Sequence, residues 1–260
     1  MSTFSAKDVQ NLRKSTGAGM MDAKRALTDS DGDFEAAVQI LREKGLAKAA
    51  KRTDRENSEG VIAVAQGDSG VALVQLKSET DFAAKSDDFR AFAQSLADAV
   101  LDGGESAIEA HSDGLEDLKL TVKENIEVGE VITYPAGDSN NLDAYLHGGG
   151  QAGVLIEGEG VDAAVLHEVA MHVAFAKPQF LSRDEVPADE VEKERAALLE
   201  ITKSEGKPEQ AWDKIVEGRV GAWFGERVLL EQGVFGEKEK VAAKIGDGKI
   251  VRFAFVKVGA

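Results

Sequence analysis

The chain has 260 residues and a formal net charge of −16 at pH 7, from 47 acidic and 31 basic side chains. Such a charge repels nucleic-acid phosphates and anionic lipid headgroups, so direct nucleic-acid or membrane binding is disfavoured. No run of about 18 apolar residues could span a bilayer, and residues 1–8 lack the apolar core of a signal peptide. The chain has no cysteine, which excludes disulfides, thiolate catalysis and cysteine-ligated metals. We therefore expect a cytoplasmic protein.

The first 55 residues form a module of distinct charge, with a net charge of +3 against −19 for the remainder. Ser5 and Asp8 have the spacing of a capping box, which predicts a helix that ends at Gly17. Further helices are expected over about 20–29 and from Asp33 to near Gly45, the last with Phe34, Ala37, Val38 and Leu41 on its inner face. Residues 46–59 are charged and predict a solvated helical tail or linker. A small three-helix domain is expected over residues 1–55.

A β-hairpin is predicted next, from β-rich runs at 60–66 and 71–76 that flank a four-residue loop, Gly67–Gly70. A short polar segment follows, and then a helix over about 87–101 with one apolar stripe. The polar segment contains Phe82, an aromatic residue beside a carboxylate. Such a side chain either inserts into a partner or tucks under the following helix, and the residues alone favour tucking.

The hairpin and helix are expected to recur later in the chain. Residues 70–74 resemble residues 153–157, and each segment closes a hairpin that precedes an apolar helix, the second over 165–175. A helix near 115–125 and a strand near 128–134 complete the first unit. We interpret the pattern as an internal duplication.

Two helices at 186–205 and 208–225 are expected to form an antiparallel pair, because Gly206 and Pro208 lie between them. Residues 249–258 predict a final strand. The fold class is therefore α+β, with segregated helices on antiparallel sheets.

The sequence offers no catalytic set, and we expect a binding protein that is not an enzyme. His167 and His172 are five residues apart, which leaves their imidazoles about 140° apart on a helix and unsuited to one metal ion. One of the two is expected to pack and the other to lie at the surface. The segment Asp29–Asp33 lacks the glycine and glutamate positions of a calcium loop, and Gly148–Gly150 is expected to supply a hairpin turn.

An ordered series of motifs resembles the bacterial translation elongation factor Ts family. It begins with Leu12–Leu27, which reads LRKSTGAGMMDAKRAL, and continues with Thr80-Asp81-Phe82. Matching segments follow at the expected intervals along almost the whole chain: 145–148, 153–155, 170–174, 177–178, 191–194, 206–208, 216–219 and 251–253.

The resemblance implies a guanine-nucleotide exchange factor that binds elongation factor Tu and needs no cofactor. It also implies an N-terminal domain similar to ubiquitin-associated domains, a duplicated core and an inserted helical hairpin. The corresponding ranges are 1–55 for the N-terminal domain, 56–140 and 141–260 for the two core subdomains, and about 181–225 for the hairpin. This hairpin could contact the partner or allow a dimeric assembly with two partner molecules.

The resemblance also implies which residues act. In the family, a Thr-Asp-Phe loop enters the GTPase near the magnesium and phosphate end of the nucleotide. The resemblance therefore implies that Phe82 inserts into the partner and does not tuck under the following helix. Ala83 departs from the family pattern, in which valine commonly follows the phenylalanine. The implied exchange loop is Thr80, Asp81, Phe82 and Ala83, and the implied partner-binding residues are Thr16, Gly17, Gly19, Met20, His147 and Gly148.

Two alternatives remain open from the sequence. The first is a protein-binding adaptor or chaperone-like partner that uses the N-terminal domain without promoting exchange. The second, more remote, is a zinc hydrolase built on His167 and His172.

Overall fold

The computed structural model describes residues 4–137 and 140–259. The predicted ranges 1–55, 56–140 and 141–260 thus include residues 1–3, 138–139 and 260, which lie outside the described residues. Contacts divide the chain into two compact units. The first unit contains the described residues up to Ala63, with Val74–Val131 and the residues from Val258 onward, and the second contains Val64–Leu73 and Ile132–Lys257.

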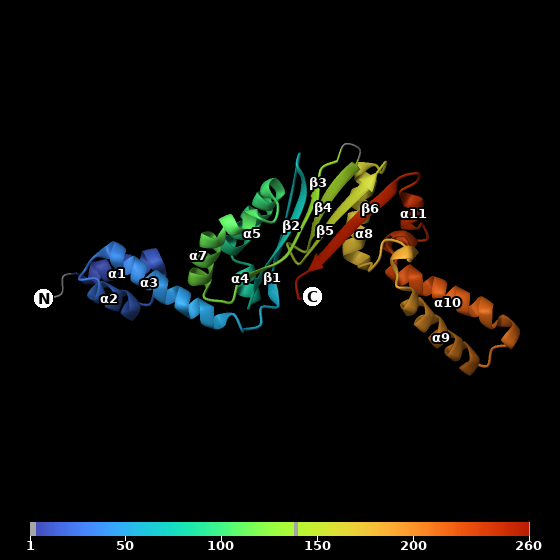
Figure 1. Ribbon diagram of the computed structural model, residues 1–260, viewed down its shortest axis with the longest axis horizontal. Helices are drawn as coiled ribbons and strands as arrows, with labels where there is room; N and C mark the ends of the chain where they lie inside the picture. Colours follow the sequence, from blue (N-terminus) through green and yellow to red (C-terminus); the bar gives the residue numbers. More distant parts are fainter. Residues whose placement is uncertain (1–3, 138–139, 260) are drawn as a thin grey trace. The chain divides into compact units, whose positions relative to one another are not determined.

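The N-terminal helices form a small bundle with its own core, as the sequence predicts. Ser5 caps the first helix, because its amide donates to Asp8 Oδ2 at 2.8 Å and its hydroxyl accepts from the Asp8 amide at 3.3 Å. Leu12 and Leu27 are fully buried at the centre of the bundle. The elements are α1 (Ala6–Thr16), α2 (Met20–Asp29), α3 (Phe34–Ala49) and a 3-10 turn, Ala50–Arg52 (Figure 1).

Two expectations for the third helix are wrong. It continues through Gly45 to Ala49, because Gly45 serves close packing rather than termination: a Cβ at this position would overlap the side chain of Leu120 on α7. Phe34 lies at the start of the helix and is 39% exposed, so it does not face inward.

The first sheet has the order β1-β2-β3. Its hairpin turn is tighter than predicted, since Gly67 and Gly70 belong to the strands and only Asp68 and Ser69 lie between them. The predicted helix over 115–125 ends earlier, at Val122, where Lys123 takes the left-handed conformation with φ 65°. The elements are β1 (Glu59–Gly67), β2 (Gly70–Ser78), α4 (Asp81–Ala84), α5 (Asp87–Gly103), α6 (Ala107–Ala110), α7 (Ser112–Val122) and β3 (Glu127–Pro135).

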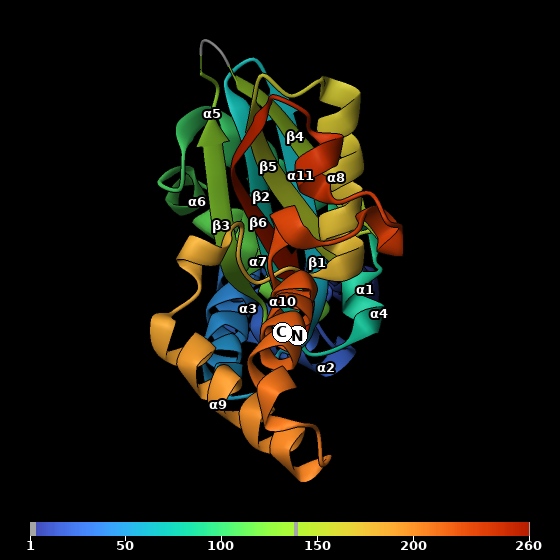
Figure 2. The same cartoon turned by 90° about the vertical axis from the view of Figure 1, so that its right-hand side faces the viewer.

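The second sheet repeats this arrangement with the order β4-β5-β6, which supports the predicted duplication. The hairpin strands β4 (Asn140–His147) and β5 (Ala152–Glu159) are antiparallel, with Tyr145 opposite Val154. Helix α8 (Ala163–Ala176) packs against both strands (Figure 2). The final strand, β6 (Lys249–Lys257), pairs with β5 and agrees with the predicted strand. The mixture of helices and antiparallel sheets confirms the α+β class.

Helices α9 (Ala188–Ser204) and α10 (Trp212–Arg227) pack on one another as the predicted pair. Each begins a few residues later than the sequence suggested: Pro187 precedes α9, and a 3-10 turn, Glu209–Ala211, precedes α10. Val216, Val220 and Phe224 form the buried side of α10. Short elements complete the chain: Arg183–Glu185, Leu229–Glu231, Val234–Gly236 and α11 (Val241–Lys244). Within the described ranges, no helix is long and apolar enough to cross a membrane.

Candidate functional site

The segment between β2 and α5 presents Phe82 to solvent. Thr80 caps the short helix α4, since its hydroxyl accepts from the Ala83 amide at 3.3 Å. Ala83 and Ala84 are buried, and their burial fixes one face of α4 against the protein. Phe82 points away from that face and is 83% exposed. The tucked conformation favoured by the residues alone is therefore wrong, and Phe82 is a large apolar side chain left free on a short, capped turn.

Asp81 lies beside Phe82 as an ionised carboxylate. Lys85, four residues on, donates to Asp81 Oδ2 at 2.6 Å and lowers the pKa of Asp81 below its ordinary value of 3.8. Lys85 is largely exposed and the Asp81 side chain is 47% exposed, so water screens the pair and little free energy is needed to separate the two groups. Asp81 can therefore exchange Lys85 for another cationic group at a partner surface.

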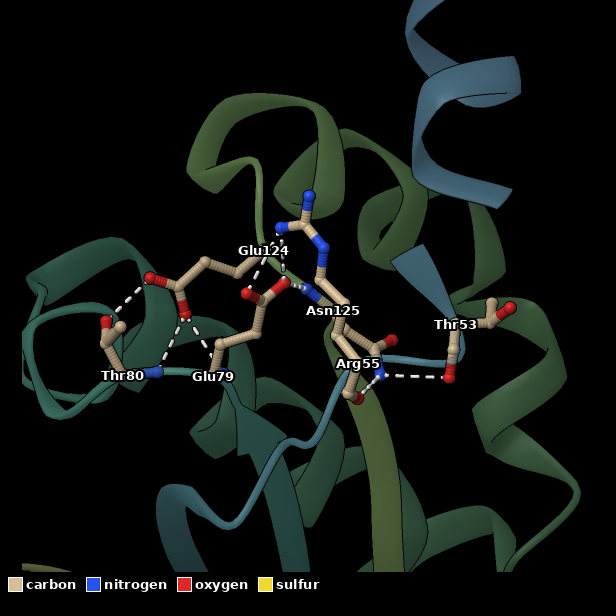
Figure 3. Close-up of polar contacts among 6 residues, drawn as sticks. All are labelled: Thr53, Arg55, Glu79, Thr80, Glu124 and Asn125. Carbon is tan, nitrogen blue, oxygen red and sulfur yellow. Dashed lines mark hydrogen bonds and ion pairs between the residues drawn. The ribbon is translucent and has the colours of Figure 1, made fainter. Parts of the chain in front are cut away.

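The turn that carries these residues, Glu79–Ala84, is called the exchange turn below, after the role that the motif resemblance implies for it. The carboxylate of Glu124, just past the end of α7, accepts three hydrogen bonds from it. Oε2 accepts from the amides of Glu79 and Thr80, each at 3.0 Å, and Oε1 accepts from the Thr80 hydroxyl at 2.6 Å (Figure 3). Because one carboxylate satisfies the amides at the start of the turn, it fixes the direction in which α4 leaves β2.

Glu79 makes the reciprocal contact. Its carboxylate accepts from the Asn125 amide at 2.6 Å and from Arg55 at 3.2 Å. The buried side chain of Asn125 donates to the carbonyls of Thr53 and Arg55, at 3.3 and 2.8 Å (Figure 3). The exchange turn, the end of α7 and the linker after the N-terminal bundle thus share one polar network.

The corner between α1 and α2 gathers the predicted residues of the N-terminal domain. Gly17 ends α1 in the left-handed conformation with φ 62°, and Gly19 starts α2 without a side-chain cap. The Thr16 hydroxyl donates to the Leu12 carbonyl at 2.6 Å. Met20 is exposed, as is its neighbour Met21. The corner therefore offers adaptable apolar side chains beside a turn that contains two glycines.

The turn between β4 and β5 holds the other predicted residues. Gly148, Gly149 and Gly150 all have positive φ values, of 60°, 66° and 102°, as expected for turn glycines. His147 is exposed at the end of β4, and its Nδ1 lies 3.1 Å from the Tyr145 hydroxyl. The turn presents an imidazole whose orientation is set by a neighbouring phenol.

The two remaining histidines of interest have separate partners, as their spacing predicted. His167 is at the surface, with Nδ1 3.0 Å from Asp143. His172 is buried, and its Nε2 lies 3.1 Å from Gln232 Oε1 while its Nδ1 accepts from the Phe235 amide at 3.0 Å. Burial lowers the pKa of His172 and favours the neutral ring. Among the residues that the structure describes, no three acidic, histidine or cysteine side chains are grouped to hold a metal ion.

Sequence reasoning missed the roles of Glu79, Glu124 and Asn125, although it singled out the segment 79–82. Their contacts join positions 44 to 46 residues apart, and no local pattern reports such pairings. The available signal was the consecutive polar residues Lys123, Glu124 and Asn125 between an amphipathic helix and a strand.

Comparison with known proteins gives a consistent result. Residues 79–260 match the family model described as Elongation factor TS. Curated relatives named Elongation factor Ts include that of Deinococcus radiodurans, 38% identical over 98% of this chain and 99% of the relative. The Cutibacterium acnes protein is 43% identical over 93% of this chain and 92% of its own length, and that of Clavibacter sepedonicus is 39% identical over the full length of both. The chain therefore belongs to the elongation factor Ts family and takes part in protein biosynthesis as a translation elongation factor.

Proposed function

We propose that the protein is a cytosolic guanine-nucleotide exchange factor for elongation factor Tu, and that it acts through binding alone, without covalent chemistry. The observation that carries the proposal is the exchange turn, in which an 83% exposed phenylalanine, Phe82, lies beside an ionised aspartate, Asp81, while Thr80 is anchored by Glu124.

 The turn therefore offers an apolar wedge and a negative charge at one point of the surface, on a backbone that Glu124 holds in place.

The wedge would act on the magnesium ion that bridges the nucleotide phosphates to the GTPase. A divalent cation is the largest local charge in such a site, so a side chain that displaces its ligands removes a large share of the affinity for GDP. A thousandfold faster release requires a dissociation barrier lower by about 4 kcal/mol. One inserted aromatic side chain and one disturbed metal site can together supply that amount.

Linkage makes the effect reciprocal. If the exchange factor weakens nucleotide binding, then nucleotide binding weakens the hold of the exchange factor on the GTPase by the same coupling free energy. GTP can therefore displace the protein and complete the cycle, and the exchange factor is not consumed.

We assign secondary contacts to the other two exposed sites. The corner at Thr16, Gly17, Gly19 and Met20 would contact the GTPase domain of the partner, because it presents exposed methionines. The turn at His147 and Gly148 would contact the third domain of the partner. The α9–α10 hairpin would serve either the partner or an assembly that contains two partner molecules.

The test is stopped-flow release of fluorescent GDP from purified elongation factor Tu, with and without the protein. We expect release to accelerate by several hundredfold or more and to saturate as the concentration of the protein increases. Tight binding without acceleration would contradict the proposal and favour the adaptor function.

A further inference from the structure

Glu124 lies outside the exchange turn and binds it directly through hydrogen bonds. Its carboxylate accepts from two backbone amides and one hydroxyl, all within Glu79 and Thr80. Hydrogen bonds to an ionised acceptor are stronger than those between neutral groups. The Thr80 hydroxyl, which caps α4, is therefore oriented by Glu124 while it accepts from the Ala83 amide.

The position of Glu124 is itself well fixed. Lys123 ends α7 in the left-handed conformation, and its ammonium group donates to the Gly17 carbonyl at 3.1 Å. Asn125, the next residue, is buried and bonds Glu79 and the linker carbonyls of Thr53 and Arg55. Glu124 is thus held between two anchored neighbours.

Helix α7, which precedes Glu124, is supported by the N-terminal bundle. Helix α3 packs against α7, with Gly45 close to Leu120 and Arg42 3.6 Å from Asp117. All of these residues belong to the first compact unit. The end of α7 is therefore a firm support rather than a second mobile loop.

We propose that Glu124 is a positioning residue for nucleotide exchange, which holds the exchange turn so that Phe82 and Asp81 are presented in the orientation that enters the partner. This inference rests on the proposed exchange function. Glu124 acts through Thr80 and the backbone of Glu79, and it needs no contact of its own with the nucleotide or the metal ion.

Two substitutions of Glu124 distinguish the effect of the shape of the exchange turn from the effect of the negative charge on the carboxylate. Glu124→Ala removes all three acceptor contacts and frees the start of the turn. In Glu124→Gln the amide oxygen can still accept from both backbone amides, and the amide nitrogen can donate to the Thr80 hydroxyl. The glutamine variant therefore preserves the shape of the turn while it removes the negative charge.

The experiment measures GDP release from elongation factor Tu across a range of exchange-factor concentrations. We expect Glu124→Ala to lower the limiting release rate about tenfold, with a smaller change in the half-saturating concentration, and Glu124→Gln to stay within about threefold of the native rate. The matched control is Glu109→Ala on α6, whose exposed carboxylate has no partner among the described residues. It should leave both parameters unchanged.

A double-mutant cycle tests whether Glu124 acts through the wedge. In the Phe82→Ala background, Glu124→Ala should lower the limiting rate by no more than about twofold, because the wedge is already absent and only Asp81 is left for Glu124 to position. Backbone amide exchange at Glu79 and Thr80 should be faster in Glu124→Ala, while the second unit keeps its native protection.

The outcomes are distinguishable. If the native protein does not accelerate release, the proposed function fails and the inference fails with it. Only the positioning role is overturned if the native protein is active and Glu124→Ala releases GDP at the same rate. The same holds if the effects of Glu124→Ala and Phe82→Ala on the limiting rate are additive. A glutamine variant as slow as the alanine variant also overturns it, because charge rather than the shape of the turn would then be responsible.

Discussion

The two hairpin–helix units of the core differ most in the connection from hairpin to helix. In the first, residues 79–86 separate β2 from α5, whereas in the second only residues 160–162 separate β5 from α8. The longer connection contains α4 and the exposed Phe82, and the shorter one leads through Asp162, which caps α8. A repeated fold thus acquires a specific feature where a connecting segment is extended, while the strands and helices keep their packing.

Replacement of the wedge should have the largest effect. Phe82→Ala is expected to lower the limiting rate of GDP release about a hundredfold, a loss typical of a dominant interface side chain. The fold should be unaffected, because Phe82 is exposed. Phe175→Ala, at an exposed phenylalanine on α8 of the second unit, is the matched control and should change the rate less than twofold. If Phe82→Ala and Phe175→Ala lowered the limiting release rate equally, the two hairpin–helix units would not differ in their contribution to exchange.

The turn of the second unit should affect binding rather than release. His147→Ala is expected to raise the half-saturating concentration about tenfold and to leave the limiting release rate unchanged, as for a contact made equally before and after GDP leaves. Gln151→Ala, in the same turn, controls for a general disturbance. A lowered limiting rate in His147→Ala would show that this turn also drives release.

The two hairpin–helix units should also differ in what they contribute to the pH dependence of stability. The tenth residue of α5 is the buried Leu96, and the tenth residue of α8 is the buried His172. Burial lowers the pKa of His172 in the folded state, so the unfolded chain takes up a proton first as the pH falls below the ordinary value of 6.5. The free energy of unfolding should therefore decrease below about pH 6.5.

His172→Gln tests this difference by urea unfolding at pH 7.5 and pH 5.5. At pH 7.5 the variant should lose about 1–3 kcal/mol, because the Phe235 amide and Gln232 lose a well-placed partner. Between the two pH values its stability should change less than that of the native protein. An equal pH dependence would mean that other groups are responsible.

The smallest expected effect comes from the net charge. With a net charge of −16, the protein should associate with a basic surface of the partner, and an increase from about 50 to 500 mM salt should slow association a few-fold. The limiting release rate should not change. An association rate that is independent of salt would contradict this contribution.

The sequence predicts those parts of the structure that depend on neighbouring residues. The Ser5–Asp8 capping box and the glycine-rich β4–β5 turn follow from local spacing, and both are observed. The prediction that the third helix ends near Gly45 was wrong because the role of Gly45 depends on Leu120, which is distant in sequence and close in space. The same limit hid Glu124, whose contacts with Thr80 arise only once α7 has packed in the first unit.

The exposure of Phe82 shows a different limit. Its apolar side chain predicts burial, since a monomer gains free energy when it covers an aromatic ring. The structure leaves Phe82 exposed because Ala83 and Ala84 occupy the buried face of α4. The motif resemblance predicted an inserting role that the physical chemistry of the isolated segment could not supply.

The most direct test of the central claim is the magnesium dependence of the Phe82 effect. The limiting GDP release rates with the native protein and with Phe82→Ala should be compared at millimolar magnesium and in excess EDTA. If Phe82 acts by displacing the metal ion, the roughly hundredfold ratio between the two proteins should fall towards one once the metal ion is absent. A ratio that stays the same in EDTA would contradict the account, because the wedge would then act on the nucleotide site without the magnesium ion.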